Sequence, residues 1–343
     1  MEISQESPWL LLTLASVCGL LAGTLASRWA LKLVPTPSPH SPNSAPHTPC
    51  TTCMALSTLS VPKLRATSCL MCGRRIPRWP VPVALLAAAT FAAFTWLLVF
   101  LRCQSVAEVQ PAGPLYLHRL PFHFLLLFLL LTAILTDLLD YSIPDAITLP
   151  GTLLAVLLAF TSGDLQMIHI WVNWDYELVS IYGPWLPQWM RDHQHLHGLA
   201  WSLAGMAAGA SVTEIIRSLA HKILGFHALG FGDVTLMAMI GAFIGWQPVL
   251  CTLAIAPLAG IAIGLPAFIL SRRSFIAFGP CLCLAAIIVI CSWRQLWEGQ
   301  KLRIIFSHWP TVASLLAGSL AAYTLLLLAL RWFRTTPPES LRH

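Results

Sequence analysis

The chain has 343 residues, of which 57% are hydrophobic and only 10% are charged. A soluble domain needs a larger charged surface, so this composition excludes an ordinary globular protein and indicates a membrane protein. The formal net charge of +6 is explained by basic residues that flank membrane spans. It therefore points to a lipid bilayer, and not to a nucleic acid, as a partner.

Apolar runs of the length that crosses a bilayer recur along the chain. Nine candidates lie at 8–33, 81–101, 119–138, 147–163, 199–220, 234–246, 250–270, 275–292 and 309–331. The run 234–246 is short and contains glycine, so the count is eight or nine. The sequence therefore predicts an all-α fold, a polytopic transmembrane helix bundle of about eight or nine spans.

The basic residues predict the orientation, because cytoplasmic loops carry an excess of Lys and Arg. With the N-terminus outside, fourteen of the 20 Lys and Arg residues fall on the cytoplasmic side and six on the outer side. Glu2 and Glu6 precede the first apolar run in place of basic residues, and no small-residue cleavage pattern follows it. We therefore expect no removable signal peptide.

Two polar stretches divide the chain into parts. Residues 34–80 start with the run PTPSPHSPNSAPHTP and continue as a basic, Cys-containing segment, which predicts a cytoplasmic linker and a small cytoplasmic Cys-rich loop domain. Residues 164–198 are rich in Trp and His and form an insertion on the outer side. We expect a first span at 1–33, a membrane core at 81–292 and, at 293–343, an outer loop, a last span and a cytoplasmic tail.

Three acids follow a strongly apolar run in the segment TDLLDYSIPDAITLPG. Asp137 ends the predicted span, where a charged side chain costs roughly 2.5–3.5 kcal/mol on insertion scales and is functional by default. Asp140 lies three residues later and can share a helix face with Asp137. Pro144 disfavours helix at the preceding residue, so Asp145 lies in the turn or starts the next span. For Asp140 and Asp145 the alternative is a helix cap or a headgroup position.

Asp233 lies in a second segment, GFHALGFGDVTLMAMIGAFIGW. Gly230 and Gly232 remove side-chain bulk just before it, so a substrate backbone can come close. Asp137 ends a span that descends to the cytoplasm and Asp233 begins one that rises from it, so both acids reach the same depth. Two carboxyl groups in close approach share one proton, and one then acts as general base on a water while the other acts as acid. This predicts an aspartyl protease whose proteolysis needs no cofactor.

At these residues the sequence resembles the prepilin peptidases, the type IV leader peptidases of the GxGD aspartyl protease class. The family motifs are an Asp followed eight positions later by the Asp of a Pro-Asp pair, a GxGD before a small and apolar helix, and a Phe-Gly-Pro at the start of a late span. The matching residues are, in turn, Asp137 and Asp145; Gly230, Gly232 and Asp233; and Phe278, Gly279 and Pro280.

The resemblance implies an endopeptidase that removes the leader from type IV prepilins or type II secretion pseudopilins at the cytoplasmic face of a bacterial inner membrane. It implies catalytic roles for Asp137 and Asp233. Many members also methylate the new N-terminus with S-adenosylmethionine. Here the first span reads AGTLAS without the family's Asn, and residues 80–84 read PVPVA without its acid, which leaves methyl transfer open. The implied supporting residues are Asp145, Gly230, Gly232, Gly279 and Pro280.

Four cysteines form two C-x2-C pairs separated by fifteen residues. In a reducing cytoplasmic loop this spacing predicts a structural zinc site of four thiolates, with unmetallated thiols as the alternative. The ligands are Cys50, Cys53, Cys69 and Cys72. Another metal hypothesis places His193, His195 and His197 on one face of an extended outer segment, with ordinary surface histidines as the alternative.

Two other classes of function compete with proteolysis. Membrane acids also line ion paths, so a transporter or proton relay is the first alternative. An inactive scaffold that binds pilin-like helices is the second. A transporter predicts paired or repeated polar spans, whereas the acids of this chain cluster at one membrane face.

Overall fold

The computed structural model describes residues 8–34, 80–109, 115–172, 186–225, 229–271 and 277–335. Within these ranges every regular element is a helix, which confirms the all-α prediction. The elements are α1 (Pro8–Leu33), α3 (Pro80–Thr95) with the π-helix η1 (Trp96–Phe100), α4 (Leu115–Asp140), α5 (Asp145–Ser162), α7 (Gln188–Asp192), α8 (Gln194–Leu224), α9 (Phe231–Ile244), α10 (Trp246–Ser271), α11 (Gly279–Arg294) with the π-helix η2 (Gln295–Gly299), α12 (Leu302–Ser307) and α13 (Trp309–Thr335).

Eight helices in the described ranges are long and apolar enough to cross a membrane, judged by length and composition. The candidate run 234–246 corresponds to α9, which has only 14 residues. At about 1.5 Å per residue α9 extends roughly 21 Å, less than the roughly 30 Å of a hydrocarbon core. The chain is therefore a multi-pass membrane protein, and its described residues contain eight candidate spans and one shorter apolar helix.

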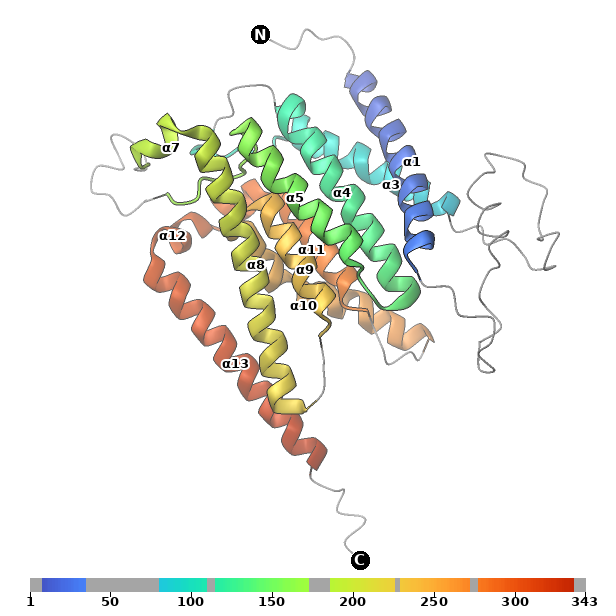
Figure 1. The fold of residues 1–343 in the computed structure, drawn as a ribbon, viewed down its shortest axis with the longest axis vertical. Helices are drawn as coiled ribbons and strands as arrows, with labels where there is room; N and C mark the ends of the chain where they lie inside the picture. The colour runs from blue at the N-terminus through green and yellow to red at the C-terminus, as the bar shows by residue number, and fades with distance from the viewer. Residues whose placement is uncertain are drawn as a thin grey trace, which may run out of the picture.

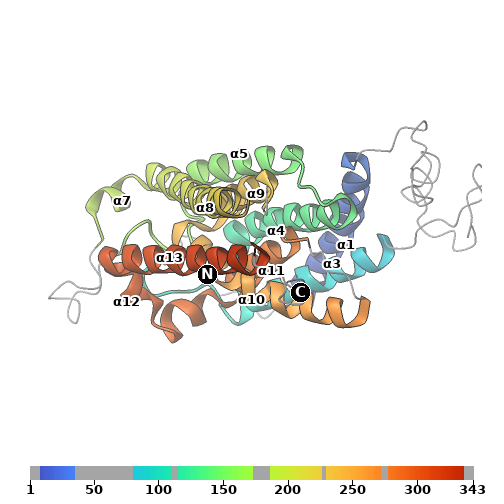
Figure 2. The ribbon, with the colours of Figure 1, turned by 90° about the horizontal axis from the view of Figure 1, so that it is seen from below.

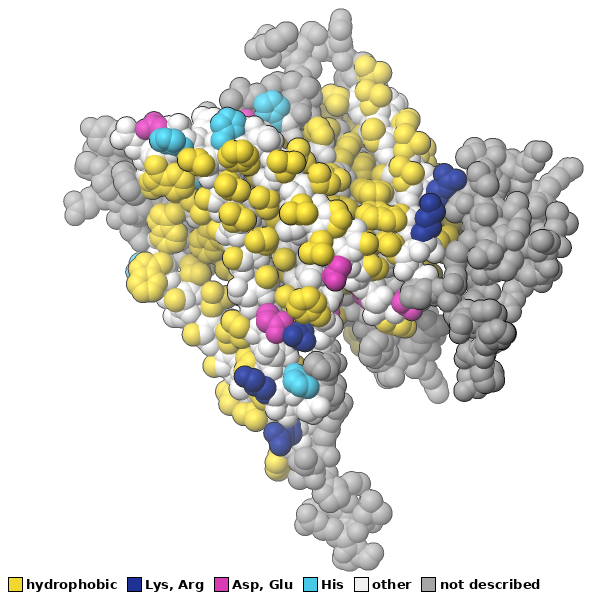
Figure 3. Space-filling model, viewed as in Figure 1, with side chains coloured by type: hydrophobic (Ala, Val, Ile, Leu, Met, Phe, Trp, Pro, Cys, Tyr) yellow, Lys and Arg dark blue, Asp and Glu magenta, His cyan; other side chains and the backbone are white. Residues whose placement is uncertain are grey.

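The short helix α9 lies inside the bundle (Figures 1 and 2). It packs against α4, α5, α8, α10 and α11, and nearly all of its side chains from Val234 to Ile244 are buried. Helix α13, in contrast, packs on α8 and leaves most of its side chains exposed. Figure 3 shows hydrophobic side chains over the broad face of the bundle, as expected for a surface that contacts lipid.

A tight turn joins α4 to α5. Tyr141 takes a positive φ of 52°, and its N–H donates to the Asp137 carbonyl at 2.9 Å. Pro144 is extended, with a ψ of 138°, and α5 starts at the next residue, Asp145. An acid in the first turn complements the helix dipole. The turn thus reverses the chain within a few residues of Asp137.

Glycines bring the backbones of α8 and α9 together. A Cβ atom on Gly205 would overlap the carbonyl oxygen of Gly241, and a Cβ atom on Gly241 would overlap that of Gly205. Gly209 faces the Met237 carbonyl in the same way. In membranes, close van der Waals packing at small residues is a main source of helix association. This contact fixes the position of α9, and therefore of Asp233, relative to α8.

We expect Gly205→Ala to destabilise the bundle, because the added methyl group pushes α8 away from α9. Overpacking of this kind costs about 1–3 kcal/mol, so the apparent melting midpoint of the full chain in detergent should fall. Gly318→Ala on α13 is the matched control, because nothing lies within 4 Å of a Cβ atom at that position. Equal midpoints for the two variants would contradict the close contact.

Candidate active site

Asp137 lies in the last turn of α4 and is only 6% exposed. Its Oδ2 atom accepts a hydrogen bond from the Gly279 backbone N–H at 3.0 Å. Gly279 is the first residue of α11 and Pro280 the second. Because Pro has no N–H and its φ suits a helix start, the Gly279 N–H is the donor that this helix end offers to the carboxylate.

Gly279 is also the residue that leaves room for Asp137. A Cβ atom on Gly279 would lie 2.5 Å from Asp137 Oδ2 and 2.9 Å from the Cδ1 atom of Ile143. Both distances are too short for a side chain at this position. The Phe-Gly-Pro segment therefore donates a hydrogen bond to Asp137 and leaves room for its carboxyl group.

Asp233 lies in the first turn of α9 and is 8% exposed. Its Oδ2 atom accepts a hydrogen bond from the N–H of Gly230, the residue that caps the helix, at 3.2 Å. An acid three residues after the cap is the usual partner of this N–H. Gly232 packs on the α4–α5 turn, since a Cβ atom there would lie 3.0 Å from the carbonyl oxygen of Ile143. A Cβ atom on Gly230 would lie at an ordinary contact distance of 3.6 Å from Asp233 Oδ2.

The structure brings Asp137 and Asp233 into one site. Ile143 contacts both Gly232, next to Asp233, and Gly279, which binds Asp137. The charge of Asp137 acts on the Asp233 carboxyl, and the buried Cys283 of α11 lies within electrostatic range of both acids. The helix ends of α4, α9 and α11 therefore enclose two buried carboxyl groups, an arrangement suited to general acid and base chemistry on a water.

The other two acids of the first segment lie outside this pair. Asp140 is exposed and accepts a hydrogen bond from the Ser142 hydroxyl at 3.1 Å. Asp145 is exposed at the start of α5. Both are near the turn that carries Ile143, so they lie at the mouth of the site and not within it.

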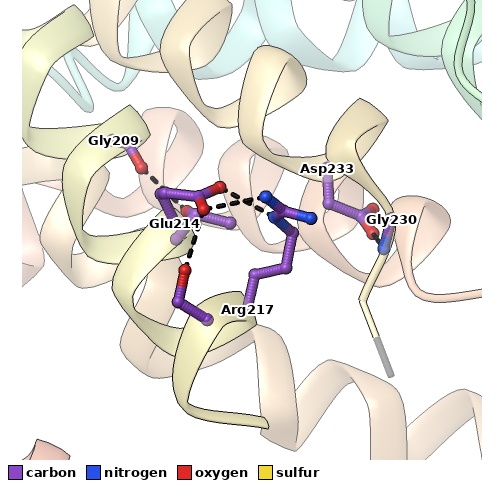
Figure 4. Close-up of polar contacts among 7 residues, drawn as sticks. Gly209, Glu214, Arg217, Gly230 and Asp233 are labelled. Carbon is purple, nitrogen blue, oxygen red and sulfur yellow. Dashed lines mark hydrogen bonds and ion pairs between the residues drawn. The ribbon is translucent and has the colours of Figure 1, made fainter. Parts of the chain in front are cut away.

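An ion pair on α8 lies beside the GxGD segment and was not singled out from the sequence (Figure 4). Arg217 donates to Glu214 through Nε at 2.7 Å and through Nη2 at 2.8 Å, and Ser218 donates to the same carboxylate at 2.9 Å. The Arg217 guanidinium lies 5.6 Å from the ring centroid of Phe231, the residue between the two glycines. The Glu-x-x-Arg spacing signals the pair, but its contact with Phe231 depends on the packing of α8 against α9.

The predicted metal ligands have two different outcomes. The four cysteines, Cys50, Cys53, Cys69 and Cys72, lie outside the described residues. The histidine hypothesis assumed an extended segment, which is wrong, because His195 and His197 lie in the first turns of α8. A helix does not place alternate residues on one face. Within the described ranges no three His, Cys, Asp or Glu side chains are grouped so that they could hold a metal ion.

Comparisons with known proteins match the part of the chain that contains both acids. Residues 124–265, which include both buried acids, match the type IV leader peptidase family. The family resemblance is confirmed. Three relatives are each named prepilin leader peptidase/N-methyltransferase. The relative from Escherichia coli K12 is 31% identical, and the match covers 48% of this chain and 60% of the relative. The relative from Legionella pneumophila is 26% identical, with 56% of this chain and 55% of the relative covered, and the relative from Pseudomonas putida is 26% identical, with 66% of this chain and 72% of the relative covered.

The chain thus covers between about half and three quarters of the length of these relatives. The family match ends before α11, so it does not include Gly279 and Pro280. No solved structure matches the chain significantly. The contact between α11 and Asp137 is therefore seen in the structure of this chain and lies outside the family match.

We expect Asp233→Asn to raise the apparent stability by roughly 1 kcal/mol, the size typical of relieving a strained functional site. The amide oxygen still accepts from the Gly230 N–H, while the repulsion between two buried carboxyl groups is gone. The melting midpoint in detergent measures this, with Asp140→Asn at the exposed neighbour as the control. A midpoint for Asp233→Asn at or below that of the control would argue against close interaction of the two acids.

Proposed function

We propose that this protein is an aspartyl endopeptidase that removes the leader peptide from type IV prepilins or pseudopilins at the cytoplasmic face of a bacterial inner membrane. The observation that carries the proposal is the pair of buried carboxyl groups of Asp137 and Asp233, with Ile143 packed against the glycines beside both. The names of the relatives support the choice of substrate.

The proposed reaction is hydrolysis of one peptide bond. One carboxylate of the pair takes a proton from a water as its oxygen attacks the peptide carbonyl carbon. The other, protonated carboxyl donates its proton to the carbonyl oxygen. The carboxyl that took the water's proton then gives it to the leaving amine as the C–N bond breaks, and a hydroxyl of the intermediate returns its proton to the second carboxylate. The hydrogen bonds from Gly279 and Gly230 hold one oxygen of each carboxyl group, which fixes how the two groups face the substrate.

The surroundings of the pair suit a leader peptide that precedes an apolar helix. Asp145 is exposed at the start of α5, where it offers negative charge to a basic leader. The large exposed hydrophobic side chains of the bundle, among them Leu138 and Leu149, offer a lipid-level surface to the apolar helix of a substrate. In this proposal Asp145 supports substrate binding, and Gly230, Gly232, Gly279 and Pro280 position the acids.

Two further features of the proposal rest on the sequence and on the names of the relatives, and not on the described structure. The C-x2-C pairs support a structural zinc site at Cys50, Cys53, Cys69 and Cys72, which metal analysis of the purified chain and of Cys69→Ser tests. The relatives are also named N-methyltransferases. This name supports a second activity, in which S-adenosylmethionine supplies a methyl group to the new N-terminus, while the missing Asn and acid noted above count against it.

We expect Asp137→Asn and Asp233→Asn each to lower leader cleavage by roughly 10²- to 10⁴-fold, because an amide can act neither as base nor as acid. The full chain is co-expressed with a pilin-like precursor that has a short basic leader and an apolar helix, and the products are followed by mass spectrometry. Asp140→Asn is the control and should keep activity. Cleavage that persists in either of the first two variants would refute the proposal, and a methyl group on the product would reveal the second activity.

Gly279→Ala should lower kcat roughly 10²-fold, because the new methyl group displaces the Asp137 carboxyl from its position and a shift of about 1 Å has an effect of this size. Gly260→Ala is the matched control, since a Cβ atom there would lie an ordinary 3.8 Å from Cys281 Sγ. Initial rates at saturating precursor in detergent measure the effect. Normal kcat for Gly279→Ala, in a protein with an unchanged melting midpoint, would show that Asp137 does not depend on this contact.

A further inference from the structure

The short segment before Asp233 contains two glycines and one aromatic residue. Gly230 and Gly232 have no side chains, so Phe231 is the one residue of this GxG segment whose side chain can fix the segment to a neighbouring helix. Glycine gives a backbone wide conformational freedom. The Asp233 carboxyl depends on this backbone, because it accepts a hydrogen bond from the Gly230 N–H. A contact that holds Phe231 therefore also holds the acid.

Phe231 is held from α8. The guanidinium carbon of Arg217 lies 5.6 Å from the centroid of the Phe231 ring, within the distance of about 6 Å at which a cation is attracted to an aromatic face. Phe231 is the first residue of α9 and is 58% exposed. Burial in the core therefore fixes this ring only in part, and the cation contributes a specific contact.

Arg217 is itself held in one orientation (Figure 4). Its Nε and Nη2 atoms donate to the two carboxylate oxygens of Glu214 at 2.7 and 2.8 Å, and the Ser218 hydroxyl donates to the same carboxylate at 2.9 Å. The side chains of Arg217 and Glu214 are 23% and 38% exposed, and an ion pair of this kind contributes little to stability. A bidentate pair does fix the plane of the guanidinium, so we infer that its role is orientation.

The Arg217 contact extends the α8–α9 interface to the start of α9. Farther along α9 the two backbones meet where Gly209 faces the Met237 carbonyl. Arg217 lies about two helical turns beyond Gly209 on α8. The GxG segment also touches the α4–α5 turn, since a Cβ atom on Gly232 would lie 3.0 Å from the carbonyl oxygen of Ile143. The segment is thus held by the turn through Gly232 and by α8 through Arg217.

We propose that Arg217 is a positioning residue for the endopeptidase. Held by Glu214, it fixes the ring of Phe231 and thereby the GxG backbone that orients the Asp233 carboxyl. This inference rests on the proposed function, and it assigns Arg217 no contact with the substrate. Loss of Arg217 should therefore slow hydrolysis without weakening the binding of the precursor, because a displaced catalytic group lowers kcat.

The division of the effect between kcat and KM tests the proposal. Arg217→Met keeps the apolar stem and removes the guanidinium, so kcat should fall roughly 3- to 10-fold, the rate equivalent of one cation–π contact, while KM stays within about twofold. Arg217→Lys keeps a cation and should restore part of the rate. Arg294→Met is the matched control, because Arg294 forms a similar helical ion pair with Glu298, at 3.3 Å, but ends α11, whereas Asp137 contacts the first residue of α11.

A double-mutant cycle tests whether Arg217 acts through Phe231. Phe231→Leu removes the aromatic ring and keeps an apolar side chain. If Arg217 acts through the ring, the variant with both changes should have about the kcat of either single variant, because the second change removes nothing further. Losses that multiply in the double variant, or a rise in KM without a fall in kcat, would overturn the proposal.

Hydrogen exchange gives a measure that needs no substrate. The full chain is labelled in detergent, and the peptide that contains Gly230 and Asp233 is followed by mass spectrometry. Exchange should be several-fold faster in Arg217→Met and in Phe231→Leu, because the Gly230 N–H is then exposed by local opening more often, and unchanged in Arg294→Met. Melting midpoints show that each variant is folded.

The two measurements separate this inference from the proposed function. If wild type cleaves the precursor and Arg217→Met keeps both its kcat and its exchange, the positioning role is refuted and the proposed function stands. If wild type cleaves no precursor, the proposed function is refuted. Exchange then decides by itself whether Arg217 holds the GxG segment, and exchange of Arg217→Met equal to that of wild type would overturn this as well.

Discussion

Two carboxyl groups have to be held at the same depth within an apolar bundle, and the arrangement of α4, α9 and α11 meets this constraint. A charged side chain in a membrane costs roughly 2.5–3.5 kcal/mol on insertion scales, and a second one beside it adds repulsion. Both acids accept a hydrogen bond from the backbone at the start of a helix, Asp137 from α11 and Asp233 from its own α9. Helix N-termini favour negative charge through the helix dipole as well as through their N–H groups.

The short length of α9 follows from the same constraint. Asp233 can meet Asp137 only if α9 starts where α4 ends, and Ile143 in the α4–α5 turn packs against the glycines beside both acids. The other end of α9 is fixed by Gly245, whose positive φ of 86° turns the chain into α10. Between these ends the helix is held against α8 by the contacts of Gly205 and Gly241. Glycine thus serves two purposes here, close helix packing and the turn into α10.

The sequence predicted the apolar helices and the break after α4 because both depend on local patterns. Apolar runs identify helices that cross a membrane, and Pro144 predicts the break between α4 and α5. The Gly279 hydrogen bond was beyond prediction from pattern, because it joins residues 142 positions apart. The same holds for the contact of Arg217 with Phe231. The histidine hypothesis failed because the histidines of 193–197 alternate in sequence while α8 starts at Gln194, and a helix does not place alternate residues on one face.

The buried side chains along α4 test the alternative function of a proton relay. A relay needs polar side chains that link one face to the other, as in membrane pumps and transporters. Along α4 the buried polar groups near its first residue, Arg119 and His123, are separated from Asp137 by the buried apolar residues Leu126 and Leu130.

The hydroxyl groups that follow on α4 do not form a relay either. Thr132 donates to the Phe128 carbonyl at 2.8 Å and Thr136 to the Ala133 carbonyl at 3.0 Å, so both bonds stay within the helix. On the facing helix, Met237 and Ile240 of α9 are fully buried and apolar. Within the described core, apolar side chains therefore separate the acid pair from the buried polar groups at the start of α4, where a proton relay would need a continuous polar path.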